Sequence, residues 1–300
     1  MMDDATPTAI YQMAAYRLAI FADQPAVNIL PETYAPGSPL ILHAQLPWLA
    51  VYMRDWLLAG VPEDDLRYWL PGADPALAYL PQPPRHVFGE WPALADALPT
   101  GEAAPEQLWL LTTPDQRESA AGALIFETLD RAGYASTPYP IQHERYRLAQ
   151  FSVWRFQRRP ADLDVPQVQF GQEDIQLLTW RVVGEPRACR NLRLQSWWRS
   201  TQVPQHNYSL TAVLANAEGQ PVSQRDAAIG ETLMQLWQPD QLVFDERVVP
   251  LPCQPGRYDL LLGLYWDDGG QLRDLEALSA AGEVLGTRFY LTSVAVEAAP

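Results

Sequence analysis

The spacing of apolar residues changes near residue 160, and this change constrains the fold more than any other feature of the sequence. Before residue 160, short apolar runs alternate with segments in which apolar residues recur at helical intervals. After it, strand-like runs follow one another, separated by turn signals such as Pro255-Gly256 and Asp268-Gly269-Gly270. The sequence therefore predicts an α+β chain of two domains that differ in class.

The first domain, residues 1–160, is predicted to be a small α/β layered, Rossmann-like domain. The expected strands are 40–44, 66–70, 108–112 and 146–156, and the expected helices are 10–21, 48–57, 91–98 and 115–132. Strands that alternate with helices are typical of a parallel sheet covered by helices. The segment 158–166 is polar and bounded by prolines, so we place the domain boundary there.

The second domain, residues 161–300, is predicted to be an antiparallel β-sandwich. Seven strand-like runs lie at 168–170, 175–183, 192–198, 208–215, 242–251, 258–266 and 288–296. Alternation within the run 258–266 assigns its residues to two faces. One face is expected to carry Tyr258, Leu260, Leu262 and Leu264, and the other Asp259, Leu261, Gly263 and Tyr265.

The charge of the chain excludes several classes of function. The 300 residues include 21 basic and 36 acidic side chains, for a formal net charge of −15, and every basic one is arginine. Without lysine the chain cannot form a Schiff base or a phosphate-loop lysine site. The excess of carboxylates repels phosphate groups, so we expect no nucleic-acid partner and no binding to anionic lipid.

Standard signatures of catalysis, metal binding and cofactor binding do not occur in the sequence. The four histidines are dispersed without the spacing of a zinc site. We therefore predict no catalytic residue, no metal and no cofactor. The two cysteines, Cys189 and Cys253, are interpreted as unrelated buried residues; a disulfide is the alternative if the chain works outside the cytosol.

Polar side chains follow two of the strands expected in the first domain. Because ligands bind at the carboxyl ends of strands in open α/β sheets, these residues predict a small polar cleft with an aromatic wall. Its predicted ligand-binding residues are Gln45, Trp48 and Thr113, with His43, Thr112 and Asp115 beside them. In the alternative, Thr113 or Asp115 caps a helix and Trp48 belongs to the core. A hydrolase or transferase that uses His43, Thr113 and Asp115 is a further hypothesis.

Adjacent aromatic residues in the second domain suggest a sugar-binding surface. Neighbours on a strand face opposite sides, so one ring each of Trp197-Trp198 and Tyr265-Trp266 lies outside the common core layer. An exposed ring flanked by polar groups can hold a sugar. The candidates are Trp197, Arg199, Tyr265, Asp267 and Asp268. Alternatively, the outer rings cover the first domain or a loop, and the two aspartates bind Ca²⁺ or form a hairpin turn.

Several segments of the second domain resemble a recurring C-terminal sandwich. They are Pro221 to Asp226, Trp237-Gln238-Pro239, Val243-Phe244-Asp245, Val249-Pro250-Leu251-Pro252 and Pro255-Gly256-Arg257-Tyr258 onward to Tyr265. This pattern is similar to the extracytoplasmic tail of multi-pass bacterial glycosyltransferases of the dolichyl-phosphate-mannose-protein mannosyltransferase type. In the first half, Pro36-Gly37-Ser38 before a strand and Gln107 to Leu111 before a helix resemble the small domain that follows the last membrane span of these enzymes.

The resemblance implies a non-catalytic extracytoplasmic module that binds or positions carbohydrate or an acceptor. The catalytic carboxylates of that family lie in a membrane-domain loop, so none is carried over to this chain. The expected partners are carbohydrate and the membrane-embedded domain of a parent protein. A structural or protein-interaction module is the alternative. The sequence shows no signal peptide and no apolar run long enough to span a membrane, so we expect the chain itself to be soluble.

Overall fold

A computed structural model describes residues 26–30, 34–44, 47–70, 83–98, 103–113, 119–139, 141, 151–161 and 163–298. The chain divides into two compact units, Met1–Arg159 and Pro160–Pro300. Among the described residues, none of the helices has both the length and the apolar character that a membrane span requires.

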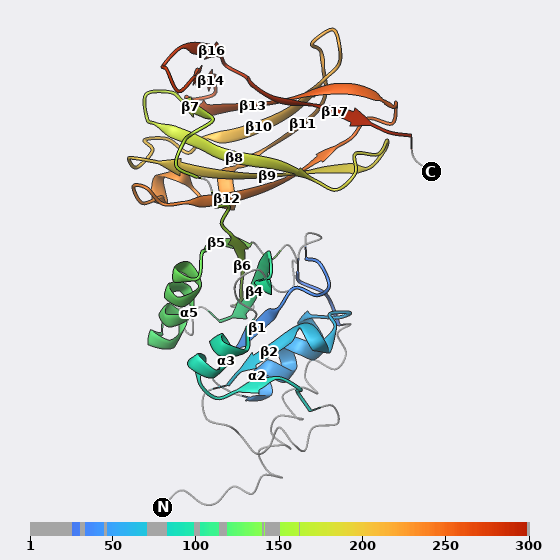
Figure 1. The fold of residues 1–300 in the computed structure, drawn as a ribbon, viewed down its shortest axis with the longest axis vertical. Coiled ribbons are helices and arrows are strands. Elements are labelled where there is room, and N and C mark those ends of the chain that lie inside the picture. The colour runs from blue at the N-terminus through green and yellow to red at the C-terminus, as the bar shows by residue number, and fades with distance from the viewer. Residues whose placement is uncertain are drawn as a thin grey trace, which may run out of the picture. The chain divides into compact units, whose positions relative to one another are not determined.

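The first unit is built on a six-stranded mixed sheet (Figure 1). Its strands are β1 (Leu40–His43), β2 (Leu66–Trp69), β3 (Val87–Phe88), β4 (Gln107–Thr112), β5 (Tyr134–Tyr139) and β6 (Ser152–Arg158). The order across the sheet is β3-β2-β1-β4-β6-β5. Strands β1 to β4 pair in parallel, whereas β6 is antiparallel to both β4 and β5.

Each face of this sheet has its own apolar cluster. Strand β1 is buried on both sides, with Leu40 and Leu42 in one cluster and Ile41 in the other. The first cluster includes residues from α2 (Pro47–Tyr52) and from the π-helical turn η1 (Met53–Leu57). The second includes residues from α3 (Trp91–Ala97) and α5 (Ala120–Arg131). Burial on both faces explains why β1 is a continuous apolar run.

The predicted Rossmann-like α/β layered class is wrong. Strands account for 45% of the structure and helices for 16%, and the strands form three sheets. In the first unit α2 and α3 have only six and seven residues, and the chain adds the antiparallel strands β5 and β6 to the parallel ones. The strand–helix alternation in the sequence did not reveal this, because strand direction depends on where a strand returns to the sheet, not on its own composition.

Some predicted elements differ from the observed ones. The helix expected at 10–21 lies outside the described residues, and so does Asp115. Helix α5 begins after Ser119, whose hydroxyl accepts a hydrogen bond from the Gly122 amide at 3.0 Å. A serine at this position satisfies an amide that the first helical turn leaves without a carbonyl partner. The short strand β5 was not predicted.

The second unit is a β-sandwich, as the sequence predicts. Its two sheets have the orders β11-β10-β13-β14, with β17 also paired to β13, and β12-β9-β8-β7-β15-β16. The strands are β7 (Val168–Phe170), β8 (Ile175–Val183), β9 (Asn191–Ser200), β10 (Ser209–Ala215), β11 (Pro221–Ala228), β12 (Val243–Pro250), β13 (Gly256–Asp267), β14 (Leu272–Asp274), β15 (Ala277–Leu278), β16 (Val284–Gly286) and β17 (Phe289–Val296). Figure 1 shows the two sheets stacked face to face.

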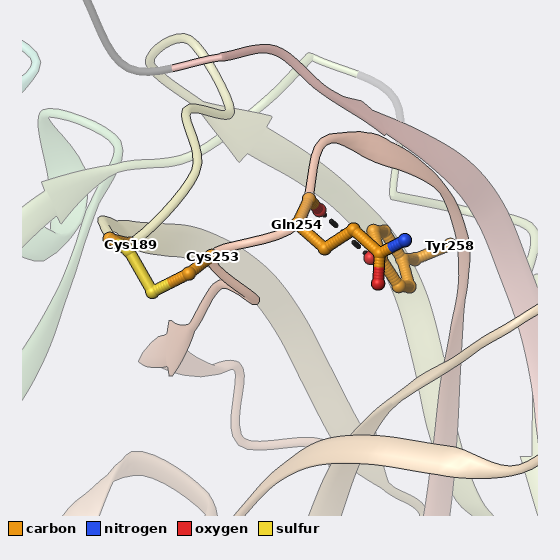
Figure 2. Close-up of a disulfide and its surroundings, with 4 residues drawn as sticks. All are labelled: Cys189, Cys253, Gln254 and Tyr258. Atoms are coloured by element: carbon orange, nitrogen blue, oxygen red, sulfur yellow. Dashed lines mark hydrogen bonds between the residues drawn. A yellow bond between two sulfur atoms is a disulfide. The ribbon is translucent and has the colours of Figure 1, made fainter.

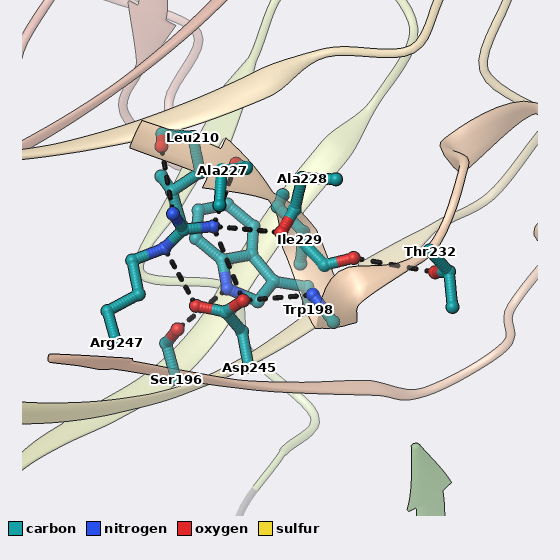
Figure 3. Close-up of polar contacts among 10 residues, drawn as sticks. Ser196, Trp198, Leu210, Ala227, Ala228, Ile229, Thr232, Asp245 and Arg247 are labelled. Atoms are coloured by element: carbon teal, nitrogen blue, oxygen red, sulfur yellow. Dashed lines mark hydrogen bonds and ion pairs between the residues drawn. The ribbon is translucent and has the colours of Figure 1, made fainter. Parts of the chain in front are cut away.

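A buried ion pair on β12 connects the two sheets of this sandwich (Figure 3). Asp245 and Arg247, both on β12, are buried and 2.9 Å apart between Arg247 Nε and Asp245 Oδ2. Arg247 also donates to the carbonyl oxygen of Leu210 on β10 at 3.0 Å and to those of Ala227 and Ala228 on β11. Its guanidinium therefore ties β12 in one sheet to β10 and β11 in the other, with charge-assisted hydrogen bonds.

A disulfide joins two loops of the sandwich (Figure 2). Cys189 lies between β8 and β9, and Cys253 lies between β12 and β13. The Cys189 amide also donates to the Pro252 carbonyl oxygen at 3.1 Å, and the Tyr258 hydroxyl donates to the Gln254 carbonyl oxygen at 2.9 Å. The interpretation of the cysteines as unrelated buried residues is therefore wrong.

Breaking the buried ion pair should destabilise the sandwich. The variant R247M leaves the Asp245 carboxylate buried without its guanidinium, so we expect the free energy of unfolding to fall by about 3–5 kcal/mol. Urea denaturation followed by tryptophan fluorescence measures this change. The matched control is R273M, because Arg273 pairs with Asp268 at the surface at 3.4 Å, and its effect should stay below about 1 kcal/mol. Equal effects of the two variants would contradict the role given to Arg247.

Candidate functional site

The outward side of the sheet that contains β13 carries a cluster of polar and aromatic side chains. On β13, Tyr258, Leu260, Leu262 and Leu264 lie in the sandwich core, so the face assignment made from the sequence is confirmed. Strand β13 pairs with β10 and β17, and β10 pairs with β11, so outward-facing residues of these four strands lie next to one another. We call this surface the tyrosine face; its members are Thr211, Gln224, Asp226, Asp259, Gly263, Tyr265, Arg288, Tyr290 and Ser293.

Thr211 and Gly263 form the floor of the tyrosine face. They are paired neighbours on β10 and β13, and Thr211 also pairs with Asp226 on β11. Thr211 is 0% exposed, and its hydroxyl has no hydrogen-bond partner among the described residues. Buried polar groups are normally satisfied. This hydroxyl is covered by the protein itself, so the contacts that the face offers to a ligand come from the exposed groups around it.

Arg288 lies over the glycine of the floor. A Cβ atom added to Gly263 would stand 2.5 Å from Arg288 Nη1 and 2.7 Å from the Thr287 carbonyl oxygen. Glycine is therefore required there, because a side chain would displace the guanidinium. Arg288 Nη1 donates to Asp274 Oδ1 and to the Thr287 carbonyl oxygen, both at 2.9 Å. Since arginine carries five N–H donors, Nε and Nη2 can still donate to a ligand.

Hydrogen-bond acceptors stand on the other side of the floor. Asp226 on β11 is exposed, and its Oδ2 accepts a hydrogen bond from Gln224 Nε2 at 2.7 Å. Its other carboxylate oxygen has no partner among the described residues. The face thus offers donors from Arg288 and acceptors from Asp226 on either side of the Thr211 hydroxyl. Such a pattern suits a ligand with several hydroxyl groups.

Two tyrosine rings stand at the two ends of the face. Tyr265 is half-buried and pairs with Ser209 and Asp274. Tyr290 is 50% exposed and pairs with Leu261. Its hydroxyl lies 3.0 Å from Ser293 Oγ, which in turn donates to Asp259 Oδ1 at 2.5 Å. This chain of hydrogen bonds holds the Tyr290 ring in place.

The predicted platform Trp197 does not lie on this face. Trp197 is on β9 in the other sheet, is only 4% exposed and contacts Phe244 with ring centroids 4.9 Å apart. The prediction that its ring is available to a sugar is wrong. Arg199, two residues further along β9, donates to Gln176 Oε1 at 2.9 Å. Neither residue meets Tyr265, because β9 and β13 belong to different sheets.

Asp267 and Asp268 belong to the turn after β13. Asp267 Oδ1 accepts a hydrogen bond from the Gly270 amide at 2.5 Å, and the Asp268 amide donates to the Gln271 carbonyl oxygen at 2.8 Å. The side chain of Asp268 lies 3.4 Å from Arg273. Within the described residues, no group of three or more potential ligands could hold a metal ion. Of the two sequence interpretations, the hairpin turn is the one observed here.

The cleft predicted in the first unit is only partly described. Gln45, Asp115 and the Trp48 side chain lie outside the described residues, and the Thr113 carbonyl oxygen accepts a bond from Thr112 at 3.4 Å. His43 is 0% exposed and stacks on Trp69 at 4.4 Å between ring centroids. The hydrolase or transferase hypothesis stays a prediction.

The surroundings of His43 keep its ring neutral. Its Nδ1 lies 3.3 Å from Thr112 Oγ1, and its Nε2 has no hydrogen-bond partner among the described residues. Because Thr112 Oγ1 donates to the Thr113 carbonyl oxygen, its lone pairs are left for an Nδ1–H donor of His43. Burial lowers the pKa of His43 to about 4.

Comparison with known proteins does not assign a family. No family model matches the chain, and no curated protein matches it. Among solved structures it is similar to the C-terminal domain of wzt, with 10% identity and a TM-score of 0.33 over 47% of this chain and 83% of that one.

Two other solved structures show weaker likeness. A CARDB domain from Pyrococcus furiosus has 10% identity and a TM-score of 0.23 over 46% of this chain and 94% of that one. An endonuclease/exonuclease/phosphatase from Beutenbergia cavernae has 13% identity and a TM-score of 0.21 over 67% and 57%. At such scores no property of these proteins is transferred to this chain.

The depressed pKa of His43 makes stability depend on pH. The unfolded chain takes up a proton at His43 below about pH 6.5 and the folded chain only below about pH 4. The free energy of unfolding therefore has its full value above pH 6.5. It decreases by roughly 3 kcal/mol as the pH falls from 6.5 to 4, because the unfolded chain takes up the proton first. Urea denaturation at pH 7 and pH 4.5 should show a larger drop for the wild type than for H43Q. Equal drops would contradict the assignment.

Proposed function

We propose that the second unit is a non-catalytic carbohydrate-binding module and that the tyrosine face is its binding site. The observation that carries the proposal is a set of accessible polar groups between two tyrosine rings, the free N–H groups of the partly exposed Arg288 and the free carboxylate oxygen of Asp226. A sugar ring would stack its C–H face on a tyrosine while its hydroxyls bond to these groups. Sugar hydroxyls both donate and accept, so one ligand can bond to both Arg288 and Asp226.

The charges on the face favour an uncharged sugar. Asp226, Asp259 and Asp274 border it, and the Arg288 guanidinium is already paired with Asp274. An acidic sugar would meet these carboxylates without a free cation to compensate on the floor itself. Like charges at short range disfavour binding, and the net charge of −15 adds to this effect. The proposed ligand is therefore a neutral glycan.

A panel of neutral glycans tests the proposal. We expect the wild type to bind at least one glucose- or mannose-based oligosaccharide in isothermal titration calorimetry. Stacking on an aromatic ring is worth about 1–3 kcal/mol by analogy with bases, so Y265A and Y290A should each weaken binding about tenfold or more. Y265F keeps the ring and should stay close to the wild type. The control L236A removes a side chain that is 70% exposed on another segment, so its affinity should not change.

If the folded protein binds none of the glycans in the panel, carbohydrate binding is contradicted. The alternative, a protein-interaction module, would then be favoured by exposed leucines on the segment between β11 and β12. Leu233 is 54% exposed and Leu236 is 70% exposed. Crosslinking and co-purification of the wild type and L236A would separate this alternative from sugar binding, because L236A would weaken capture of a protein partner.

The proposal includes an extracytoplasmic location, as part of a glycosyltransferase-like membrane protein whose membrane-embedded domain is the partner. Two observations support it: the resemblance of the sandwich segments and the Cys189–Cys253 disulfide. Disulfides persist mainly in oxidising compartments and are rare in the cytosol. The neutral-glycan site is compatible with such a module, since its task would be to hold an acceptor or product without reacting with it.

Thiol blocking in intact cells of the native host checks this location. We expect both cysteines to be protected from a membrane-permeant maleimide until a reductant is added. The sequence separation of 64 residues gives the disulfide about 4 kcal/mol of stabilisation in the chain-entropy model, so a reductant should lower the melting temperature. The variant C253S should not respond to the reductant. Free thiols in untreated cells would contradict the proposed location.

A further inference from the structure

The two tyrosines of the face are too far apart to contact a single sugar ring. Tyr290 pairs with Leu261, which precedes Tyr265 by four residues on β13. With a rise of about 3.4 Å per residue, the two positions are roughly 14 Å apart along the strand. Tyr290 also leans toward Ser293, whose partner Asp259 lies still further from Tyr265. Both rings can therefore be occupied only by a chain of several sugars.

Arg288 forms the surface between the two rings. Gly263 and Thr211 are both buried, and Arg288 lies over Gly263, where a Cβ atom would stand 2.5 Å from its Nη1. The Arg288 side chain is 35% exposed, so its free N–H groups can reach the hydroxyls of a chain that passes over it. Asp226 and Gln224 border the same stretch from β11. The polar groups thus lie between the aromatic platforms, where the interior units of a bound chain would be.

Both platforms are held in position before any ligand binds. The hydrogen bonds from Tyr290 through Ser293 to Asp259 fix one ring. Tyr265 lies within the paired part of β13, between β10 and β14, so its backbone cannot move independently. A site whose rings are already ordered loses less conformational entropy on binding. It therefore favours ligands long enough to contact both rings at once, because the second contact is then intramolecular.

We propose that the occupant of the tyrosine face is an internal stretch of a linear, uncharged oligosaccharide that contacts Tyr265 and Tyr290 together. This inference rests on the proposed function and narrows its substrate class. Single sugars and chain ends are bound through one ring only. Acidic chains are disfavoured by the carboxylates of Asp226, Asp259 and Asp274.

Affinity as a function of chain length tests the inference. The probes are glucose, mannose and their linear α- and β-linked oligomers of two to six units, measured by calorimetry on the full chain. We expect at least one series to bind tenfold or more tightly at five or six units than at one. In Y265A and in Y290A this dependence on length should disappear, so that the hexamer binds no more than about threefold better than the monomer. Y265F should keep it.

The outcomes separate this inference from the proposed function. If monomer and hexamer bind the wild type equally, and the alanine variants weaken both, the face binds single sugars and the inference is overturned while the proposed function stands. If none of the probes binds, both fail. If linear oligogalacturonate binds more tightly than the neutral hexamers, the uncharged class is overturned. The control L236A should match the wild type throughout.

Discussion

The alternation of side chains along β13 is the constraint on which the rest of the sandwich depends. Leu260, Leu262 and Leu264 are fully buried in the core, which leaves Leu261, Gly263 and Tyr265 on the opposite side of the same strand. A shift of one residue in pairing would exchange the two sets and bring three leucines to the surface. The burial of these leucines therefore determines the position of Tyr265 and the glycine floor.

The sandwich holds this strand in place by contacts at several points. Arg247 bonds to main-chain oxygens of β10 and β11, which carry Thr211 and Asp226 on their outward sides. The disulfide restrains the loop that leads into β13. A buried ion pair gives little net stability compared with apolar side chains. Removing one partner is costly, however, so Arg247 must keep its bonds to the carbonyl oxygens of Leu210, Ala227 and Ala228.

Part of the sandwich and its outward face could be predicted from the sequence, whereas other predictions made from it were wrong. The two faces of β13 followed from period two alone, and Tyr265 was correctly assigned to the face opposite the core leucines. The same rule placed Trp197 outside the core layer, yet it does not say whether an outward ring is covered, and Trp197 is buried. The Rossmann-like class failed because β5 and β6 join the sheet antiparallel to their neighbour, a choice that depends on long-range pairing.

By itself the sequence determined that the second half is a sandwich, that its arginine-only, acidic composition disfavours nucleic acid, and which β13 residues are buried together. The tertiary structure alone decided that Arg288 and Tyr290, which no pattern in the sequence singled out, stand beside Thr211 and Asp226. Strand periodicity is a local property and can be read along the chain. Neighbours across strands depend on register, and the β13–β17 pairing contains an irregularity between Leu260 and Leu261 that no local pattern reveals.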